Sequence, residues 1–180
     1  YKRQIPTIIT PHYHPKRSPK FSIYESVCGP LMLHFADFVI ALTKSEAAYY
    51  LHIGIKKVVV IPNGTHLPHI KESEVIKSFK KKHGLGNHVV LSVGRIEKRK
   101  GLRYLIRAIH LLIQEFPSIQ LAIVGEDAGY LKQLEPLAKK LEITKHFVYL
   151  KTLENDDLSM AYESSYLVAI ASSYEAFGIT

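Results

Sequence analysis

The stretch LSVGRIEKRKG, residues 91–101, places basic side chains directly after a short apolar run. The run HVVLSV predicts a buried strand, and the apolar residues from Leu102 to Phe116 recur at helical spacing. Arg95 and Lys100 therefore fall in a turn from a strand to a helix. Backbone N–H groups and the helix dipole at such a turn attract phosphate. The stretch therefore predicts a phosphate-binding turn. The alternative interpretation is a solvated charged loop without a ligand.

Three further loops in the second half of the chain carry residues suited to ligand binding. Gly125 and Glu126 end one apolar run, Lys151 follows another, and residues 172–178 follow a third. Ligands of open parallel sheets bind outside the carboxyl ends of the strands. We therefore expect the four loops to meet at one edge of a sheet, which favours a ligand site over a plain charged loop.

Short apolar runs alternate with helical patterns in two blocks, which predicts parallel sheets built from β-α-β units. In the first block we expect strands at 6–10, 37–42 and 57–62, and helices at 24–36 and 44–54, the second of them capped by Thr43. In the second block we expect strands at 88–93, 119–125, 146–150 and 165–171, and helices at 101–116, 129–142 and 155–165. The Lys-rich segment 76–84 predicts a solvated helix face that ends at Gly84.

Composition narrows the class of protein. The chain has 180 residues and is 47% hydrophobic, so it can bury a substantial core. No apolar run approaches the roughly 20 residues that cross a bilayer, and the N-terminal residues lack the apolar core of a signal peptide. The single cysteine, Cys28, excludes an internal disulfide and fits a reducing compartment. The expected location is the cytoplasm.

The net charge of +8 implies an anionic partner: nucleic acid, a membrane face or a phosphorylated small molecule. Nucleic acid is not expected, because basic residues interleaved with exposed aromatics are not evident. The pairs His12 and His14, and His66 and His69, have no Cys or carboxylate partner at ligand spacing. We therefore expect no metal site.

Four stretches resemble, in order and spacing, the motifs of a known family: KVVVIPNG, SVGRIEKRKGLRYLIRA, LAIVGEDAGYLKQL and FVYLKTLENDDLSMAYESSYLVAIASSYEAFGIT. They are similar to the retaining nucleotide-sugar glycosyltransferases of the GT-B fold, the group of glycogen synthases, sucrose synthases and bacterial mannosyltransferases. The resemblance implies an α/β fold of two Rossmann-like domains, both incomplete in this chain. Residues 1–64 would end the acceptor-side domain, 65–85 would form the linker and a first helix, and 86–180 would form a truncated donor-binding domain.

The same resemblance assigns the donor diphosphate to two side chains and a loop. Arg95 and Lys100 would clamp the diphosphate, and the backbone N–H groups of Phe177, Gly178 and Ile179 would bind it as well. Fixed cations and N–H dipoles stabilise the charge that builds on the leaving diphosphate, so neither a metal nor another cofactor is expected.

The rest of the donor is assigned to four residues. Glu175 resembles the first acid of a paired-glutamate motif and would contact the transferred sugar as the catalytic residue. Gly94, Gly125 and Leu153 would bind the nucleotide. Lys151 stands where many relatives have Gly, which puts the contacts to the base in doubt.

The predicted reaction moves a sugar from a nucleoside diphosphate to a hydroxyl of a sugar, polysaccharide or lipid, with retention of configuration. A peripheral membrane contact is left open, and the isolated chain is expected to be inactive, since most of the acceptor side is missing. Two other classes of protein are alternatives to a glycosyltransferase. A dinucleotide-binding oxidoreductase is disfavoured because no Gly-x-Gly-x-x-Gly follows a strand. A basic nucleotide- or nucleic-acid-binding module without transferase activity would instead show a steep, sequence-independent loss of binding with salt.

Overall fold

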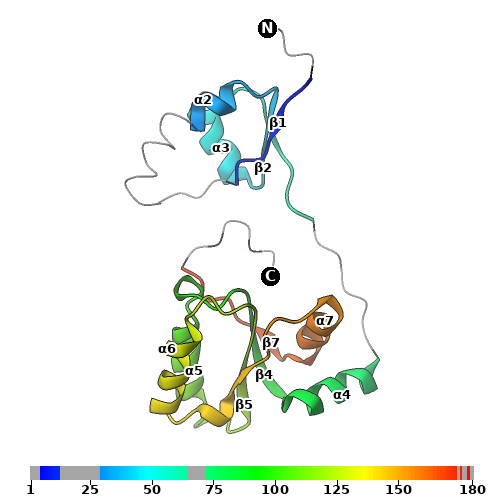
Figure 1. Ribbon diagram of the computed structural model, residues 1–180, viewed down its shortest axis with the longest axis vertical. Coiled ribbons are helices and arrows are strands. Elements are labelled where there is room, and N and C mark those ends of the chain that lie inside the picture. Colours follow the sequence, from blue (N-terminus) through cyan, green and yellow to red (C-terminus); the bar gives the residue numbers. More distant parts are fainter. Residues whose placement is uncertain (1–4, 13–28, 65–71, 174, 176–177, 179–180) are drawn as a thin grey trace. The chain divides into compact units, whose positions relative to one another are not determined.

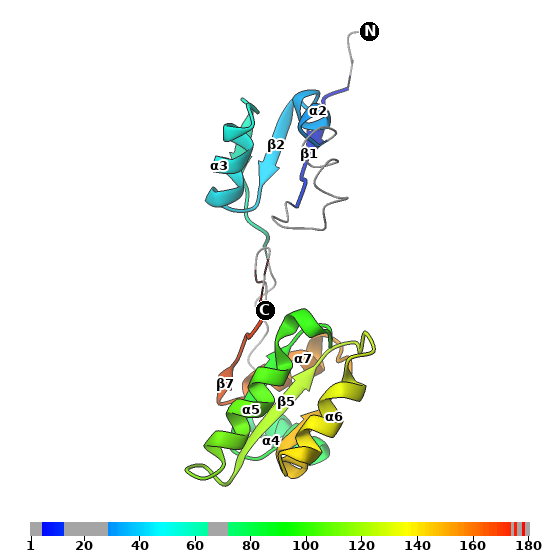
Figure 2. The same cartoon turned by 90° about the vertical axis from the view of Figure 1, so that its left-hand side faces the viewer.

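The computed structural model describes residues 5–12, 29–64, 72–173, 175 and 178 (Figures 1 and 2). Residues 1–65 form one compact unit and residues 66–175 form another. Each unit is built around its own parallel sheet. The expected α/β fold is confirmed, and the two units are described separately below.

The first unit contains a three-stranded parallel sheet in the order β1-β2-β3. Its strands are β1 (Ile8–Ile9), β2 (Phe38–Ala41) and β3 (Val58–Val60), and its helices are α2 (Gly29–His34) and α3 (Lys44–His52). Thr43 caps α3 as expected, because its hydroxyl accepts the backbone N–H of Glu46 at 3.1 Å. The Glu46 carboxylate accepts the N–H of Leu42 at 2.6 Å in return, so this turn resembles a capping box.

The second unit contains a four-stranded parallel sheet in the order β6-β5-β4-β7. The strands are β4 (His88–Val93), β5 (Ile119–Val124), β6 (Phe147–Tyr149) and β7 (Leu167–Val168). The helices are α4 (Ser73–His83), α5 (Leu102–Leu112), α6 (Leu131–Lys140) and α7 (Asn155–Ser164), and Lys98–Lys100 and Thr144–His146 form short 3₁₀ turns.

Helices cover both faces of the second sheet, with α5 and α6 on one face and α4 and α7 on the other (Figure 1). Successive strand residues therefore enter different cores: Val90 packs with Ile106 and Leu134, whereas Leu91 packs with Phe79. This arrangement explains why the strands are apolar throughout, and the expectation from the sequence is confirmed.

Most of the predicted elements are a few residues shorter in the structure, and two differ most. The helix predicted to reach Phe116 ends at Leu112, and a turn over residues 113–115 leads to Pro117. The strand predicted at 165–171 pairs only at Leu167–Val168, since among the described strands it has β4 alone as a neighbour. Of the helix predicted at 24–36, the structure shows Gly29–His34, and residues 24–28 lie outside the described part of the chain.

We expect the second unit to depend on burial along one stripe of α5. Ile106 is fully buried, whereas Leu111 on the same helix is 73% exposed. Ile106→Ala should lower the free energy of unfolding by about 2 to 5 kcal/mol, because it leaves a cavity between α5 and the sheet. The matched change Leu111→Ala should alter it by less than about 0.5 kcal/mol. Chemical denaturation followed by circular dichroism measures both, and equal effects would contradict this packing.

Candidate functional site

The strand order places a reversal of the chain between β4 and β7. From β4 the chain moves to β5 and then β6, and it returns to β7 on the other side of β4. Open α/β sheets bind ligands at such a switch point, outside the carboxyl ends of the strands. The loop after β4 carries Arg95 and Lys100, and the loop after β7 carries Glu175. The fold therefore brings the predicted site residues to the position where a ligand is expected.

The loops after β4 and β7 are in direct backbone contact. A Cβ atom on Gly101 would lie 2.0 Å from the carbonyl oxygen of Ala171, so only glycine permits this approach. The N–H of Ser173 donates to the carbonyl of Arg99 at 2.9 Å. Gly101 also has φ of 67°, a left-handed conformation that side chains disfavour. Gly101 thus fixes the distance between the two loops.

Lys100 and Glu175 meet across this contact. The Lys100 Nζ donates to the Glu175 Oε1 at 2.6 Å, and the Ser172 hydroxyl donates to the same oxygen at 2.6 Å. Both charged side chains are mostly covered, with 23% and 29% of their surface exposed. The stem of Lys100 lies over Gly94, where a Cβ would come 3.2 Å from the Lys100 Cε. A cation and an anion are therefore held side by side at the switch point.

The pKa of Glu175 reflects this environment. Burial by itself would raise the pKa, but the hydrogen bonds from Lys100 and Ser172 and the positive charges of Lys100 and Arg99 lower it below its ordinary value. Glu175 is therefore ionised at neutral pH. A carboxylate in this state accepts hydrogen bonds from hydroxyl groups and does not act as a proton donor.

The other basic side chains of the turn behave differently. Arg95 is well exposed, and its Nε lies 4.0 Å from the carboxylate of Glu126, which is also exposed. Such a pair contributes little in water and leaves the guanidinium available. Arg99 forms a closer ion pair with Glu97, at 2.9 Å, within the same turn. This local pairing fits a structural role for Arg99.

The loop after β5 packs against the loop after β4. A Cβ on Gly125, which has φ of 143°, would lie 2.1 Å from the carbonyl oxygen of Gly94. The N–H of Gly94 donates to the backbone carbonyl of Val124 at 2.9 Å, and the N–H of Ile96 donates to the backbone carbonyl of Glu126 at 2.8 Å. The absence of a side chain at Gly125 therefore allows its close approach to the neighbouring loop.

The loop after β6 joins this arrangement through Lys151. The N–H of Gly125 donates to the carbonyl oxygen of Lys151 at 2.9 Å. Lys151 has φ of 62°, a left-handed conformation that costs a non-glycine residue roughly 1 to 2 kcal/mol. This explains physically why glycine suits the position and shows that lysine can keep the same backbone. The four loops thus meet at one edge, as expected.

The helix ends at this edge differ in their capacity for an anion. The Asp127 carboxylate accepts N–H groups from Gly129, Tyr130 and Leu131, so it occupies the start of α6. In contrast, α5 begins at Leu102, and its N-cap residue, Gly101, has no side chain that could cap it. The positive end of the α5 dipole therefore adds to the cations of the Lys100 turn.

The remaining predicted site residues are Leu153, Gly178, Phe177 and Ile179. The side chain of Leu153 packs against the core beneath the sheet, so any contact with a nucleotide would be through its backbone. Gly178 is exposed with φ of 72°. Phe177 and Ile179 lie outside the described residues. Within the described ranges, no group of three or more His, Cys, Asp or Glu side chains is arranged to hold a metal ion.

Three residues at this edge have roles that the sequence did not predict. Asp127 could have been found as an acid just before a helix. Ser172 and Tyr149, whose hydroxyls bond Glu175 and the carbonyl of Gly125, gave no signal, because their roles depend on contacts between distant segments.

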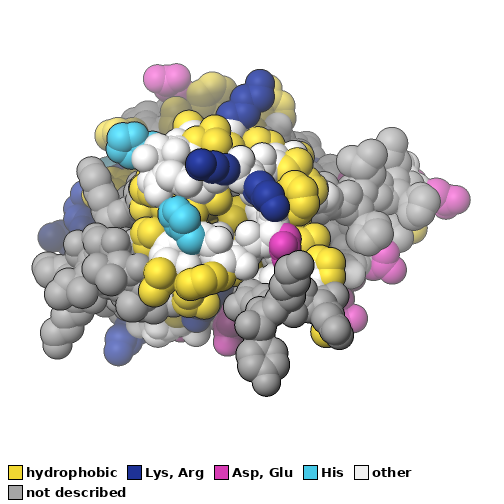
Figure 3. Space-filling view, turned by 90° about the horizontal axis from the view of Figure 1, so that it is seen from above, with side chains coloured by type: hydrophobic (Ala, Val, Ile, Leu, Met, Phe, Trp, Pro, Cys, Tyr) yellow, Lys and Arg dark blue, Asp and Glu magenta, His cyan; other side chains and the backbone are white. Residues whose placement is uncertain are grey.

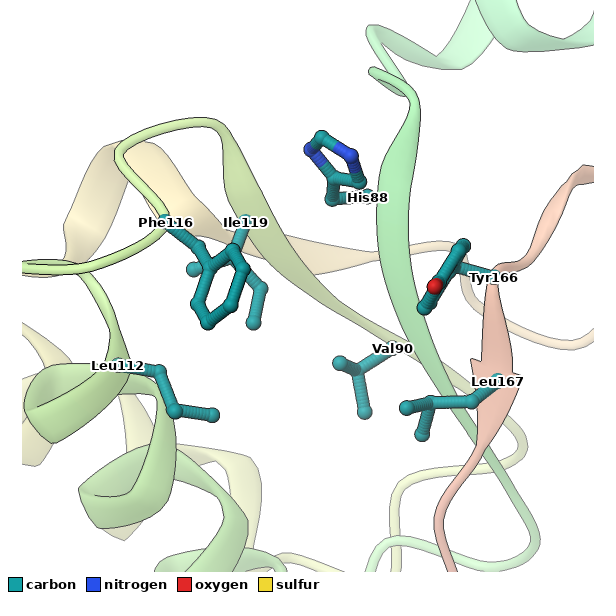
Figure 4. A pocket seen from close by; sticks show the side chains of 7 residues that line it. All are labelled: His88, Val90, Leu112, Phe116, Ile119, Tyr166 and Leu167. Atoms are coloured by element: carbon teal, nitrogen blue, oxygen red, sulfur yellow. The ribbon is translucent and has the colours of Figure 1, made fainter.

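A separate apolar pocket lies near the amino end of β4, with a volume of about 250 Å³ (Figure 4). It is lined by His88, Val90, Leu112, Phe116, Ile119, Tyr166 and Leu167. No Lys or Arg is among these residues, so the pocket lacks the cations that a diphosphate needs. The carboxyl edge of the sheet, where the cations are, is the better candidate site.

Together the fold and the site define an open α/β protein with a basic, glycine-lined ligand edge. A model of the family described as glycosyl transferases group 1 matches residues 74–180, and a model of glycosyltransferase family 4 matches residues 1–67. Because the first match covers more than half of the chain, the chain belongs to the glycosyltransferase group 1 family.

Curated relatives agree with this assignment. The D-inositol 3-phosphate glycosyltransferase of Corynebacterium urealyticum is 27% identical over 168 residues, which are 85% of this chain and 39% of that protein. The alpha-monoglucosyldiacylglycerol synthase of Streptococcus pneumoniae is 28% identical over 128 residues, which are 67% of this chain and 29% of that protein. The chain therefore spans well under half the length of these relatives.

Solved structures share the fold. HepE of Anabaena in complex with UDP and glucose has a TM-score of 0.81 at 23% identity, covering 96% of this chain and 48% of its own. Sucrose-phosphate synthase of Thermosynechococcus elongatus has a TM-score of 0.71 at 22% identity, covering 96% of this chain and 46% of its own. These likenesses confirm the expected GT-B fold.

Gly101 offers a direct test of the contact between the loops. Gly101→Ala should destabilise the chain by about 1 to 3 kcal/mol more than Gly84→Ala, because it overpacks the contact with Ala171. Gly84 is a matched control, since its φ of 65° equals that of Gly101 within a few degrees but no atom lies within 4 Å of its added Cβ. Denaturant unfolding measures both variants. Equal losses would mean that only backbone strain, and not the loop contact, requires glycine at position 101.

The lowered pKa of Glu175 predicts a pH-dependent contribution to stability. A lowered folded pKa stabilises the folded chain above the ordinary value of 4.5, and this contribution is lost as the pH falls through the folded pKa. The difference in unfolding free energy between wild type and Glu175→Gln should be constant near neutral pH and shrink below pH 4.5. The exposed acid Glu135 on α6 is the control, and Glu135→Gln should stay close to wild type throughout. A difference for Glu175→Gln that did not change with pH would refute the ion pair.

Proposed function

We propose that the protein to which this chain belongs transfers a sugar from a nucleoside diphosphate to a hydroxyl acceptor, with retention of configuration. The observation that carries the proposal is the ion pair of Lys100 and Glu175 at the switch point of the second sheet, in a turn that also carries the exposed Arg95. A cationic group suits the diphosphate, and an ionised acid beside it suits the hydroxyls of a sugar. The two halves of a nucleotide-sugar therefore have complementary partners at one edge.

The diphosphate half is proposed to bind Arg95, Lys100 and the uncapped start of α5. Departure of a nucleoside diphosphate builds negative charge on its oxygens, and fixed positive groups stabilise that charge most in the transition state. The backbone N–H groups of Phe177, Gly178 and Ile179 are proposed to add to them. With these donors, the chemistry that we propose uses no metal ion or other cofactor.

The sugar half is proposed to bind Glu175. Its carboxylate is ionised and would repel the phosphates, so its favourable ligand is a neutral hydroxyl. Lys100 would serve both halves of the donor. Its ammonium group contacts Glu175, and it would also reach a phosphate oxygen next to that carboxylate. Since Glu175 is held in hydrogen bonds, we propose that it orients the sugar and that the acceptor attacks on the face of the leaving diphosphate.

The nucleotide and the acceptor are proposed from the relatives. HepE is described in complexes with UDP, with UDP-glucose, and with UDP and glucose, which supports a nucleotide-sugar donor. Gly94, Gly125 and the backbone of Leu153 are proposed to lie along the nucleotide. Curated relatives are named for inositol phosphate and diacylglycerol acceptors, which supports a sugar or lipid hydroxyl as the acceptor. We propose action in the cytoplasm, with a lipid acceptor reached by peripheral contact.

Helices that could span a membrane are not found in the described part of the chain.

The alternative of a basic nucleic-acid-binding module has the net charge of +8 in its favour. Figure 3 shows one face, on which described Lys and Arg side chains lie among hydrophobic and acidic ones. A steep, sequence-independent loss of binding with salt would favour this alternative over a nucleotide-sugar site.

The proposal predicts that Arg95 and Lys100 hold a nucleoside diphosphate. The double change Arg95→Ala and Lys100→Ala should weaken binding of UDP, GDP or ADP, whichever binds best, by up to about 3 to 6 kcal/mol, since each charge-assisted contact contributes about 1.5 to 3 kcal/mol. Titration calorimetry measures the affinity.

The double change Lys81→Ala and Lys139→Ala is the control, because it removes the same charge from exposed positions on α4 and α6. It should leave the affinity within about twofold of wild type, since exposed charges at a distance are largely screened. Equal effects of the two double changes would mean that the nucleotide responds to net charge alone, and the proposed clamp would be wrong.

A further inference from the structure

The side chain of Tyr149 reaches from the end of β6 to the loop after β5. Tyr149 is the last residue of β6 and pairs with Ile123 of β5. Its ring packs against the core that α5 and α6 cover, and its hydroxyl donates to the carbonyl oxygen of Gly125 at 3.0 Å. The hydroxyl therefore contacts the backbone of the ligand edge, while the ring belongs to the core.

The backbone of Gly125 is held on both of its polar groups. Its carbonyl accepts the hydroxyl of Tyr149, and its N–H donates to the carbonyl of Lys151 at 2.9 Å. Tyr149 and Lys151 both come from the carboxyl end of β6, so one short segment fixes the orientation of this glycine. The left-handed backbone of Lys151 shows that the segment keeps this geometry at an energetic cost.

The fixed Gly125 in turn supports the turn that carries the cations. Its Cα side packs on the Gly94 peptide so closely that an added Cβ would lie 2.1 Å from the Gly94 oxygen. Two neighbouring backbone hydrogen bonds extend this contact between the loops after β4 and β5. The N–H of Ile96 donates to the carbonyl of Glu126, and the N–H of Ala128 donates to the carbonyl of Ile96. The stem of Lys100 in turn lies over Gly94, since a Cβ added to Gly94 would lie 3.2 Å from the Lys100 Cε. A continuous series of contacts thus leads from Tyr149 through Gly125 and Gly94 to Lys100.

We propose that Tyr149 is a positioning residue of the donor site, whose hydroxyl fixes the Gly125 loop and through it the Gly94–Lys100 turn. This inference rests on the proposed function, because it gives the turn the task of holding a diphosphate. The hydroxyl remains a donor at neutral pH, since burial raises the pKa of Tyr149 and the nearby carboxylates of Asp127 and Glu126 act in the same direction. The backbone N–H of Asp127 opposes them and does not reverse the shift.

Tyr149→Phe tests the inference, because it keeps the ring in the core and removes only the hydroxyl. Amide hydrogen exchange measured by NMR reads the loops without any ligand. The N–H groups of Gly125 and Ile96 should exchange roughly 2- to 12-fold faster, the range expected for one lost hydrogen bond, while the amides of the middle of β4 should not change. Tyr166→Phe is the matched control at the opposite end of the sheet, and it should leave Gly125 and Ile96 unchanged.

A double-mutant cycle then connects the loops to the ligand. Titration calorimetry with UDP, GDP and ADP should show a roughly 2- to 12-fold weaker affinity in Tyr149→Phe. In the background of Lys100→Ala the same change should weaken the affinity by a smaller factor, because Arg95 is then the one diphosphate-binding side chain left in the turn that Tyr149 positions. A merely structural role would lower thermal stability and leave the effect on affinity equal in both backgrounds.

The outcomes separate the inference from the function on which it rests. Unchanged exchange at Gly125 and Ile96 in Tyr149→Phe would overturn the inference and leave the proposed function intact. Additive effects of Tyr149→Phe and Lys100→Ala on affinity would also overturn it. If wild type bound none of the three diphosphates, the proposed function and the donor role of Tyr149 would both be overturned, whatever the exchange rates showed.

Discussion

Two backbone contacts without intervening side chains determine the geometry of the ligand edge. Gly101 touches the carbonyl of Ala171, and Gly125 touches the carbonyl of Gly94, each so closely that a single Cβ would overlap the neighbour. The loops after β4, β5 and β7 are consequently joined to one another and not only to their strands. Since packed backbone is hard to deform, the side chains on these loops inherit a defined position. Lys100 and Glu175 owe their proximity to these contacts.

The electrostatics of the site follow from that proximity. A lone lysine and a lone glutamate in half-covered positions would each be costly to charge, but at 2.6 Å they stabilise one another. The pair leaves the carboxylate ionised and the ammonium next to the uncapped start of α5. Asp127 caps the start of α6, whereas the start of α5 has no side-chain cap. A ligand with a negative end and a hydroxyl-rich end fits this division of charge.

Much of the second unit could be predicted from the sequence, since its information is local. The strand at 88–93 has the predicted bounds, and Gly84 ends α4 in the left-handed conformation that its type allows. Lys100 and Glu175 lie in contact, as expected from their places in the loops after two parallel strands. What could not be predicted depends on distant partners. The hydroxyl of Tyr149 acquires its role only because β6 lies beside β5, and Ser172 acquires its role only where Glu175 folds back onto it.

The central claim is that a nucleoside diphosphate binds at the carboxyl edge between β4 and β7. An NMR titration of the chain with UDP, GDP and ADP, observing backbone amides, tests it most directly. The account predicts that the largest shifts fall on residues 94–101 and 172–175, with little change around the apolar pocket of His88, Phe116 and Tyr166. Largest shifts at that pocket, or shifts spread over the Lys-rich face of α4, would contradict it.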